Sequence, residues 1–178
     1  MNVVELLIAQ HMEIRDLFAE VQKASGAERA DAFARLVRLL AVHETAEEVV
    51  VHPAARSLDG GADIVADRLA EEREAKELLS RLEDLGPDHP AFPDELELLR
   101  GMVLEHAHHE EAYEFRYLLA HHDPERLEAM AGLVRAAERA APTHPHPGTE
   151  SAAANLAVGP VVALFDRVKD AVRGSLER

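Results

Sequence analysis

Apolar residues recur at steps of three and four positions along four long stretches of the chain, and this spacing predicts amphipathic helices. We expect these helices at about residues 2–24, 28–57, 62–85 and 94–121. The polar breaks between them include "LDGGAD" and "GPDHPAFP", whose glycines and prolines end helices. Strand-like alternation of apolar and polar residues is absent from the sequence. The chain is therefore predicted to be all-α.

Short connections join the four helices, which favours an antiparallel up-down-up-down four-helix bundle over residues 1–122. We expect a helical extension over residues 123–178. Its parts are an Ala-rich helix at about 124–140, a proline-rich linker at 142–150 and a final helix that begins near Pro160. The apolar stripe of that final helix must be covered, either because it folds back on the bundle or because the chain forms a homodimer.

The amino-acid composition and the net charge limit which partners the protein can bind and where in the cell we expect it. Hydrophobic residues make up 47% of the chain and aromatic residues only 4%, a balance typical of helical bundles. The net charge of −15 argues against nucleic acids and anionic membranes as partners. The chain has no cysteine, so disulfides and thiolate metal sites are excluded. It has neither an apolar segment long enough to cross a bilayer nor a signal-peptide pattern, so we expect a cytoplasmic location.

Two short segments break the expected division between an apolar interior and a polar surface. "HETAEE" places His43 four residues before Glu47, and "HAHHEE" places His106 four residues before Glu110. Each pair lies in the apolar stripe of its helix, as does His11 in the first helix. Residues four apart lie on the same side of a helix, one turn apart. Each helix can therefore present an imidazole and a carboxylate to one site between the helices.

Buried imidazoles and carboxylates without partners would cost several kcal/mol for each charged group. A metal centre removes this cost, whereas a single pair with this spacing is usually a salt bridge on the surface. Two facing carboxylates can each bridge two ions while the histidines each bind one. Mixed nitrogen and oxygen ligands with open positions suit iron or manganese better than zinc. The pattern therefore favours a dinuclear metal centre inside the bundle.

These segments resemble those of the haemerythrin-like, HHE cation-binding family. The resemblance covers about residues 5–121 and rests on "AQHMEIRDLF", "HETAEEVVVHP", "EEREAKELL" and "HAHHEEAYEFRYL". It implies a non-haem di-iron centre, with two iron ions and an oxo bridge, inside a four-helix bundle. The positions that match the family's nitrogen ligands are His11, His43 and His106, and those that match its bridging carboxylates are Glu47 and Glu110.

The third helix departs from the family pattern, which commonly has a histidine ligand where this chain has Glu72. Glu72 is expected to be a ligand as well, because a carboxylate also binds iron; the alternative is that it only pairs with Lys76 or Arg73. An additional carboxylate would favour ferric iron over reversible O2 carriage. Glu44 is either an extra ligand or a surface residue. Tyr113 hydrogen-bonds a bound oxygen ligand, binds iron directly or is a core aromatic.

The C-terminal segments "APTHPHPGTES" and "ANLAVGPVVALFDRVKDAV" are similar to those of haemerythrin-like proteins from mycobacteria and related actinobacteria. This similarity implies that the protein decomposes hydrogen peroxide or reacts with nitric oxide, so its partner would be a peroxide or a diatomic molecule. Two other classes of function stay open. One is a module that binds or senses O2, nitric oxide or iron without turnover. The other is a structural module in which the metal only holds the bundle together.

Overall fold

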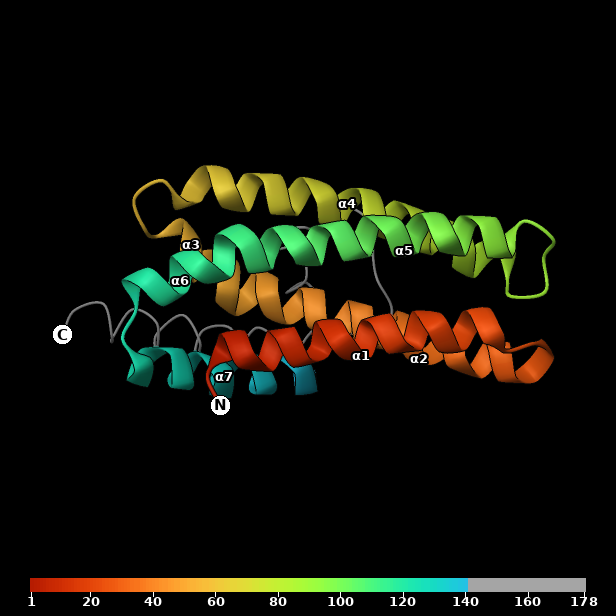
Figure 1. Ribbon diagram of the computed structural model, residues 1–178, viewed down its shortest axis with the longest axis horizontal. Coiled ribbons are helices and arrows are strands. Elements are labelled where there is room, and N and C mark those ends of the chain that lie inside the picture. Colours follow the sequence, from red (N-terminus) through yellow and green to blue (C-terminus); the bar gives the residue numbers. More distant parts are fainter. Residues whose placement is uncertain (141–178) are drawn as a thin grey trace.

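The computed structural model describes residues 1–140, and every regular element in this range is a helix (Figure 1). In chain order the elements are α1 (Val3–Lys23), α2 (Gly26–Ala46), the π-helical turn η1 (Glu47–Val51), α3 (His52–Arg56), α4 (Gly61–Leu85), α5 (Phe92–His109), the π-helical turn η2 (Glu110–Glu114), α6 (Phe115–His121) and α7 (Pro124–Ala140). The predicted all-α fold is confirmed. The predicted linker at 142–150 and the final helix near Pro160 lie outside the described residues.

Four long bundle helices run antiparallel to their neighbours in the chain (Figure 1). The first is α1 and the third is α4, whereas the second is built from α2, η1 and α3 and the fourth from α5, η2 and α6. This arrangement confirms the predicted up-down-up-down topology. Helix α7 packs against α1, α2 and η1 at one end of the bundle. None of the helices within residues 1–140 is both long enough and apolar enough to cross a membrane.

Local sequence signals fix where bundle helices begin and end. At the start of α1, the Asn2 side chain accepts a hydrogen bond from the Glu5 N–H, and the Glu5 carboxylate accepts one from the Asn2 N–H. This reciprocal cap satisfies donors that have no partner within the first turn. Pro93 lies in the first turn of α5, where its missing N–H is not needed. Helix α4 ends at Gly86, whose φ of 77° suits glycine.

Both π-helical turns begin at the glutamate of a His-x-x-x-Glu pair, Glu47 in η1 and Glu110 in η2. After each turn an N–H donates to the carbonyl five residues earlier: His52 to Glu47, and Phe115 to Glu110. A π-helical turn holds an additional residue, so the positions that follow are rotated relative to a regular α-helix. Beyond each glutamate, the residues that point to the bundle interior are therefore not all those that α-helical periodicity predicts. Such turns occur frequently at functional sites.

The apolar core is divided into two clusters, one on either side of a polar layer at mid-bundle. The first cluster includes Val3, Leu7, Val50, Ala54, Val65, Phe115 and Leu118, together with Leu127, Met130 and Val134 of α7. The second includes Ile14, Phe18, Phe33, Leu36, Leu40, Leu79, Phe92, Leu99 and Val103. On α1, His11 stands between Leu7 of the first cluster and Ile14 of the second. Since α7 contributes to the first cluster, it packs on the bundle; the predicted domain boundary after residue 122 stays a prediction.

Gly61, where α4 begins, is expected to tolerate no side chain. A Cβ atom at Gly61 would lie 1.9 Å from the backbone oxygen of Ala55. We expect Gly61→Ala to lower the free energy of unfolding by roughly 1–3 kcal/mol, the range for forced overpacking. The matched control is Gly101→Ala in α5, where no atom lies within 4 Å of the added Cβ. That change should stabilise the helix by roughly 0.5–1 kcal/mol. Urea unfolding followed by circular dichroism measures both, and changes of the same sign would contradict this description.

Candidate metal centre

All six side chains predicted as metal ligands are buried in the polar layer. They come from all four bundle helices and are His11 of α1, His43 of α2, Glu47 of η1, Glu72 of α4, His106 of α5 and Glu110 of η2. Two of the carboxylates, Glu47 and Glu110, are 0% exposed. Groups of this polarity are rarely buried unless they are paired or bind a metal. The layer is therefore the part of the bundle whose chemistry must be explained.

Four of these side chains form one compact set, called the first group below. One donor atom from each of His11, His43, Glu47 and Glu110 lies within 4.8 Å of the others. His11 Nε2 is 3.2 Å from Glu110 Oε2, and His43 Nε2 is 3.2 Å from Glu47 Oε2. Ligand atoms around a single ion lie about 3–4 Å apart, because each is about 2.1 Å from the ion. The first group therefore has the size of a single metal site.

His106 lies beside the first group, near the other oxygen of Glu110. Its Nε2 is 3.4 Å from Glu110 Oε1, whereas His11 faces Glu110 Oε2. The two oxygens of Glu110 thus face histidines from different helices. A carboxylate in this position can bind one ion through each oxygen, which is the bridging arrangement expected for Glu110.

The rings of His11, His43 and His106 are each held by a hydrogen bond at Nδ1, whereas Nε2 of each ring faces Glu47 or Glu110. At Nδ1 the partners are Glu111 for His11 at 2.9 Å, Gln10 for His43 at 2.8 Å and Glu71 for His106 at 3.0 Å. An N–H at Nδ1 can donate to each of these oxygens, which leaves the Nε2 lone pair directed toward the centre. Outer hydrogen bonds of this kind fix the ring orientation of histidines that bind metals.

Several buried donor atoms of the layer have no hydrogen-bond partner among the described residues. They are Nε2 of His11 and His106, both carboxylate oxygens of Glu47 and Glu110, and Oε2 of Glu44, Glu72 and Glu114. Buried polar groups in native proteins are nearly all paired, and an unpaired group costs about 1–3 kcal/mol. Nitrogen and oxygen lone pairs that converge on one place are suitable ligands for iron and manganese. These residues therefore fit a metal centre.

The electrostatics of the layer also favour a bound cation. Burial and the charge of Glu110 raise the pKa of Glu47 well above its usual value. Burial, with a smaller effect of His11, lowers the pKa of His43 to about 3, so its imidazole is neutral at pH 7. Burial opposes ionisation of Glu110, but His106 and His11 outweigh it and hold the pKa of Glu110 well below its usual value. A cation would relieve the repulsion between two such carboxylates.

Glu72 lies at the edge of the centre, between two cationic side chains. Its Oε1 is 2.6 Å from His52 Nε2, and its Oε2 is 3.5 Å from Lys76 Nζ. Glu72 does not belong to the first group. The ion pair with Lys76 is the arrangement that the sequence left open as an alternative. The role of Glu72 as a metal ligand stays a prediction.

Lys76 of α4 is buried and faces carboxylates of the second bundle helix. Its Nζ donates to Glu48 and lies 3.6 Å from Glu44 Oε2. Burial raises the pKa of Glu44 to about 8, although the charge of Lys76 opposes this shift. Burial also opposes the charge of Lys76, but the surrounding carboxylates outweigh it and raise the pKa of Lys76. Lys76 therefore stays charged. The surface position considered for Glu44 is wrong, because its side chain is buried.

Two buried residues of the layer, His52 and Glu114, are absent from the ligands predicted from the sequence. His52 Nδ1 is 2.9 Å from Glu114 Oε1, while its Nε2 faces Glu72. One donor atom from each of His52, Glu110 and Glu114 lies within 4.8 Å of the others, and this set is called the second group below. The two residues lie five positions after Glu47 and four after Glu110. The available signal was a Glu-Glu pair followed at this spacing by another ligand-type residue, in "EEVVVH" and "EEAYE".

Tyr113 lies outside the buried centre. Its side chain is 58% exposed, and its ring centre is 6.1 Å from that of His109. The wider turn η2 rotates Tyr113 away from the side of Glu110, whereas Glu114 is 0% exposed. The core position considered for Tyr113 is therefore wrong. Its exposure gives no support to a contact with a bound oxygen ligand.

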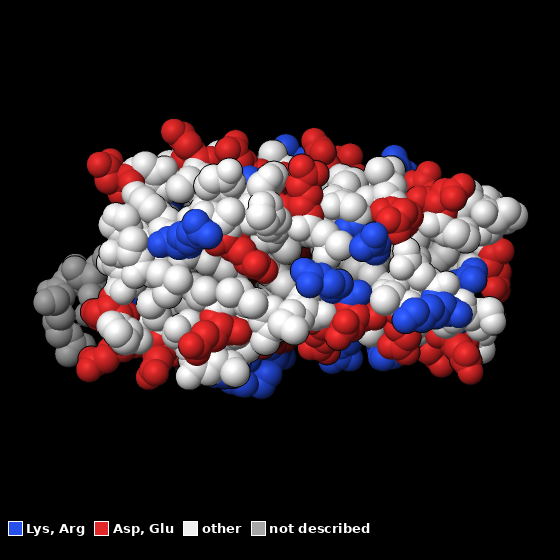
Figure 2. All heavy atoms as spheres, viewed as in Figure 1, with Lys and Arg blue, Asp and Glu red and all other residues white. Residues whose placement is uncertain are grey.

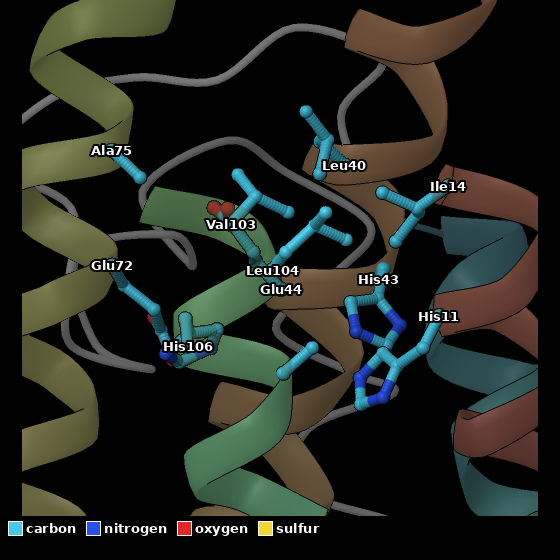
Figure 3. Close-up of a pocket in the computed structure, with 11 residues that line it drawn as sticks. His11, Ile14, Leu40, His43, Glu44, Glu72, Ala75, Val103, Leu104 and His106 are labelled. Carbon is cyan, nitrogen blue, oxygen red and sulfur yellow. The ribbon is translucent and has the colours of Figure 1, made fainter. Parts of the chain in front are cut away.

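A small cavity adjoins the polar layer on the side of the second apolar cluster (Figure 3). Its volume is about 20 Å³, and its lining combines His11, His43 and His106 with the apolar Ile14, Leu40 and Val103. Figure 3 shows His11 and His43 side by side at one side of this cavity. A space of about 10–15 Å³ holds one water molecule, so the cavity has room for a ligand of a few atoms.

Comparisons with known proteins agree with this arrangement. Residues 2–118 match the family model described as Hemerythrin HHE cation binding domain. A DNA nickase of Nostoc sp. is 28% identical over 139 residues, which cover 78% of this chain and 39% of the nickase. An uncharacterised hemerythrin-like protein of Schizosaccharomyces pombe is 24% identical over 180 residues, which cover 99% of this chain and 87% of that protein.

A solved structure has the same fold. It is that of a hemerythrin HHE cation binding domain-containing protein from Mycobacterium kansasii, with a TM-score of 0.71 and 23% identity. The match covers 79% of this chain and 86% of that chain.

Proposed function

Because the chain belongs to the hemerythrin HHE cation-binding family, we propose that it holds a non-haem di-iron centre that decomposes hydrogen peroxide. Membership of the family makes the chain a metal-binding module. The observation that best supports two ions is at Glu110, where one buried oxygen faces His11 and the other faces His106. The ions would be held by the ligands expected from the sequence, which are His11, His43, Glu47, Glu72, His106 and Glu110.

Bound iron would supply the redox chemistry, in which two molecules of hydrogen peroxide yield one O2 and two molecules of water. The side chains of the protein orient the donor atoms and exclude bulk water. Glu111, Gln10 and Glu71 hold the three histidine rings through Nδ1, so that each Nε2 faces the centre. The two apolar clusters close the layer from both sides.

The donor types favour reaction with peroxide over reversible binding of O2. Three buried carboxylates, Glu47, Glu72 and Glu110, would stabilise ferric iron, whereas reversible O2 binding requires reduced iron to persist. The cavity of about 20 Å³ admits only a small reactant, such as peroxide or a diatomic molecule. Because nitric oxide is also small enough for this cavity, the experiment must distinguish reaction with nitric oxide from decomposition of peroxide.

We expect the iron-loaded protein to release O2 from hydrogen peroxide in large molar excess over protein, as measured with an oxygen electrode. Glu72→His should shift the visible spectrum and slow this turnover, because it replaces an anionic group beside the centre. His108→Ala, at an exposed position of α5, should leave both unchanged. Equal rates and spectra for wild type and Glu72→His would place Glu72 outside the metal environment.

Other outcomes of the same experiment would support the alternative functions. Less than one O2 per chain, together with uptake of O2 or nitric oxide by the reduced protein, would indicate a binding or sensing module. An iron-loaded protein that reacts with none of these molecules would indicate a structural metal.

Cleavage of DNA is not part of this proposal, although one relative is named a DNA nickase. The chain spans only 39% of that protein. Its net charge of −15 also repels phosphates. On the face shown in Figure 2, the Lys and Arg side chains are interspersed with Asp and Glu. That face therefore offers a nucleic acid backbone no continuous basic track.

A further inference from the structure

The second group lies beside the first and shares one residue with it. Donor atoms of His52, Glu110 and Glu114 lie within 4.8 Å of one another, and Glu110 also belongs to the first group. Glu110 and Glu114 are both 0% exposed, and His52 is buried as well. The predicted set of ligands gives no role to His52 or Glu114. Both residues therefore require an explanation for their burial.

The π-helical turn η1 brings His52 to the centre, whereas Glu114 lies on the same side of its helix as Glu110. In a regular α-helix, a residue five positions after Glu47 would be rotated about 140° away from it. In η1 the His52 N–H instead donates to the Glu47 carbonyl, so His52 lies one wide turn below Glu47. Glu114 follows Glu110 by four residues, a spacing that places both on the same side of the fourth bundle helix, and Glu114 is buried. The two bundle helices thus each place a second metal-ligand type of side chain in the polar layer.

Hydrogen bonds within the layer leave donor atoms of the second group unsatisfied. His52 pairs with Glu114 Oε1 and Glu72 Oε1. Glu114 Oε2 and both oxygens of Glu110 are buried and have no hydrogen-bond partner among the described residues. A protonated His52 that only bridged Glu72 and Glu114 would leave Glu114 Oε2 without a partner, and the Glu110 oxygens would face only His11 and His106. A metal ion would satisfy them and balance their charge.

We propose that His52 and Glu114 are ligands of the second metal ion, which they would hold together with Glu110. This proposal rests on the proposed function, because it assigns the second position of the same centre. One imidazole and two carboxylates suit a transition metal ion such as iron or manganese. His52 would bind through Nδ1, which faces Glu114, while its Nε2–H donates to Glu72. His106 does not belong to the second group, but its Nε2 faces Glu110 Oε1.

A titration of the metal-free protein with Co2+ tests this assignment without any measurement of activity. Visible absorption of bound Co2+ counts the equivalents that bind, and we expect two for the wild type. We expect one equivalent each for His52→Gln and Glu114→Gln, because the glutamine amide fills similar space and is a poor metal ligand. The control is His108→Gln on α5, an exposed position that should bind two. Circular dichroism verifies that all variants keep the helical fold.

The outcomes separate this proposal from the proposed function. Two equivalents bound by either His52→Gln or Glu114→Gln would overturn the assignment and leave His52 as a structural cation. Loss of both equivalents from a folded variant would also overturn it, because the two positions would not be separate. A wild type that binds one equivalent would exclude the second position alone. A wild type that binds no metal would exclude the proposed function itself.

Discussion

Glu110→Ala is expected to yield purified protein that retains almost no iron. Glu110 is the residue common to the first and second groups, and its two oxygens face His11 and His106. Without this carboxylate each metal position loses a ligand, and the two cations lose the negative charge between them. Plasma mass spectrometry of the purified protein measures the iron content. A thermal unfolding curve should also become insensitive to added iron, because binding to the folded state stabilises it only while a site exists.

The iron content of Glu110→Ala is compared with that of two matched variants. The family resemblance gives Glu47 a bridging role as well, but in the structure Glu47 belongs to the first group only. From this geometry, Glu47→Ala is expected to lose one ion and keep the other. Glu105→Ala removes an exposed carboxylate from the same helix as His106 and should keep both ions. Retention of one ion by Glu110→Ala would contradict its shared role. Loss of both ions from Glu47→Ala would mean that Glu47 bridges as well.

Lys76→Met is expected to lower the free energy of unfolding by roughly 3–5 kcal/mol, the range for removal of one partner from a buried ion pair. Lys76 is 4% exposed, and its ammonium group contacts Glu48 and faces Glu44 and Glu72. Methionine keeps the apolar stem but leaves the carboxylates without their cation. Proton uptake by Glu48, whose pKa burial raises to about 7 even beside Lys76, would relieve part of this loss. Urea unfolding followed by circular dichroism measures the change.

The control for Lys76→Met breaks an ion pair at the surface. Arg100→Met removes the partner of Glu97, and the side chains of this pair are 34% and 53% exposed. We expect a much smaller effect there, because solvent screens exposed charges. Addition of Glu48→Gln to Lys76→Met should restore part of the stability. Equal losses for Lys76→Met and Arg100→Met would show that the buried carboxylates do not depend on Lys76.

Helical periodicity predicted most residues of the candidate site, because these residues occupy positions in the apolar stripes of their helices. On α1 the sequence Leu7, His11, Ile14 continues the apolar stripe, and the structure buries all three. The same spacing placed His43 and His106 in the interior. Their burial follows from local helix geometry, which is the property that a single sequence reveals best.

The prediction failed beyond the two glutamates, where the helices are no longer α-helical. Regular periodicity directs Tyr113 inward and gives no inward place to His52, whereas the structure exposes Tyr113 and buries His52. The segments "EEVVV" and "EEAYE" contain neither glycine nor proline, so their composition does not signal a π-helical turn. The contacts of His52 and Glu114 join separate bundle helices. Spacing along one helix cannot reveal such contacts.

The polar layer between the two apolar clusters has a consequence for how the helices are aligned along the bundle axis. If one bundle helix slid by a single turn, about 5.4 Å, its buried histidine or carboxylate would face the apolar side chains of a cluster. The apolar clusters alone discriminate weakly between such alignments, because leucine, valine and alanine can repack in similar space. Polar residues in the cores of coiled coils select one register in the same way, at a cost in stability. We therefore expect a bundle with leucines in place of this layer to be more stable and less uniquely aligned.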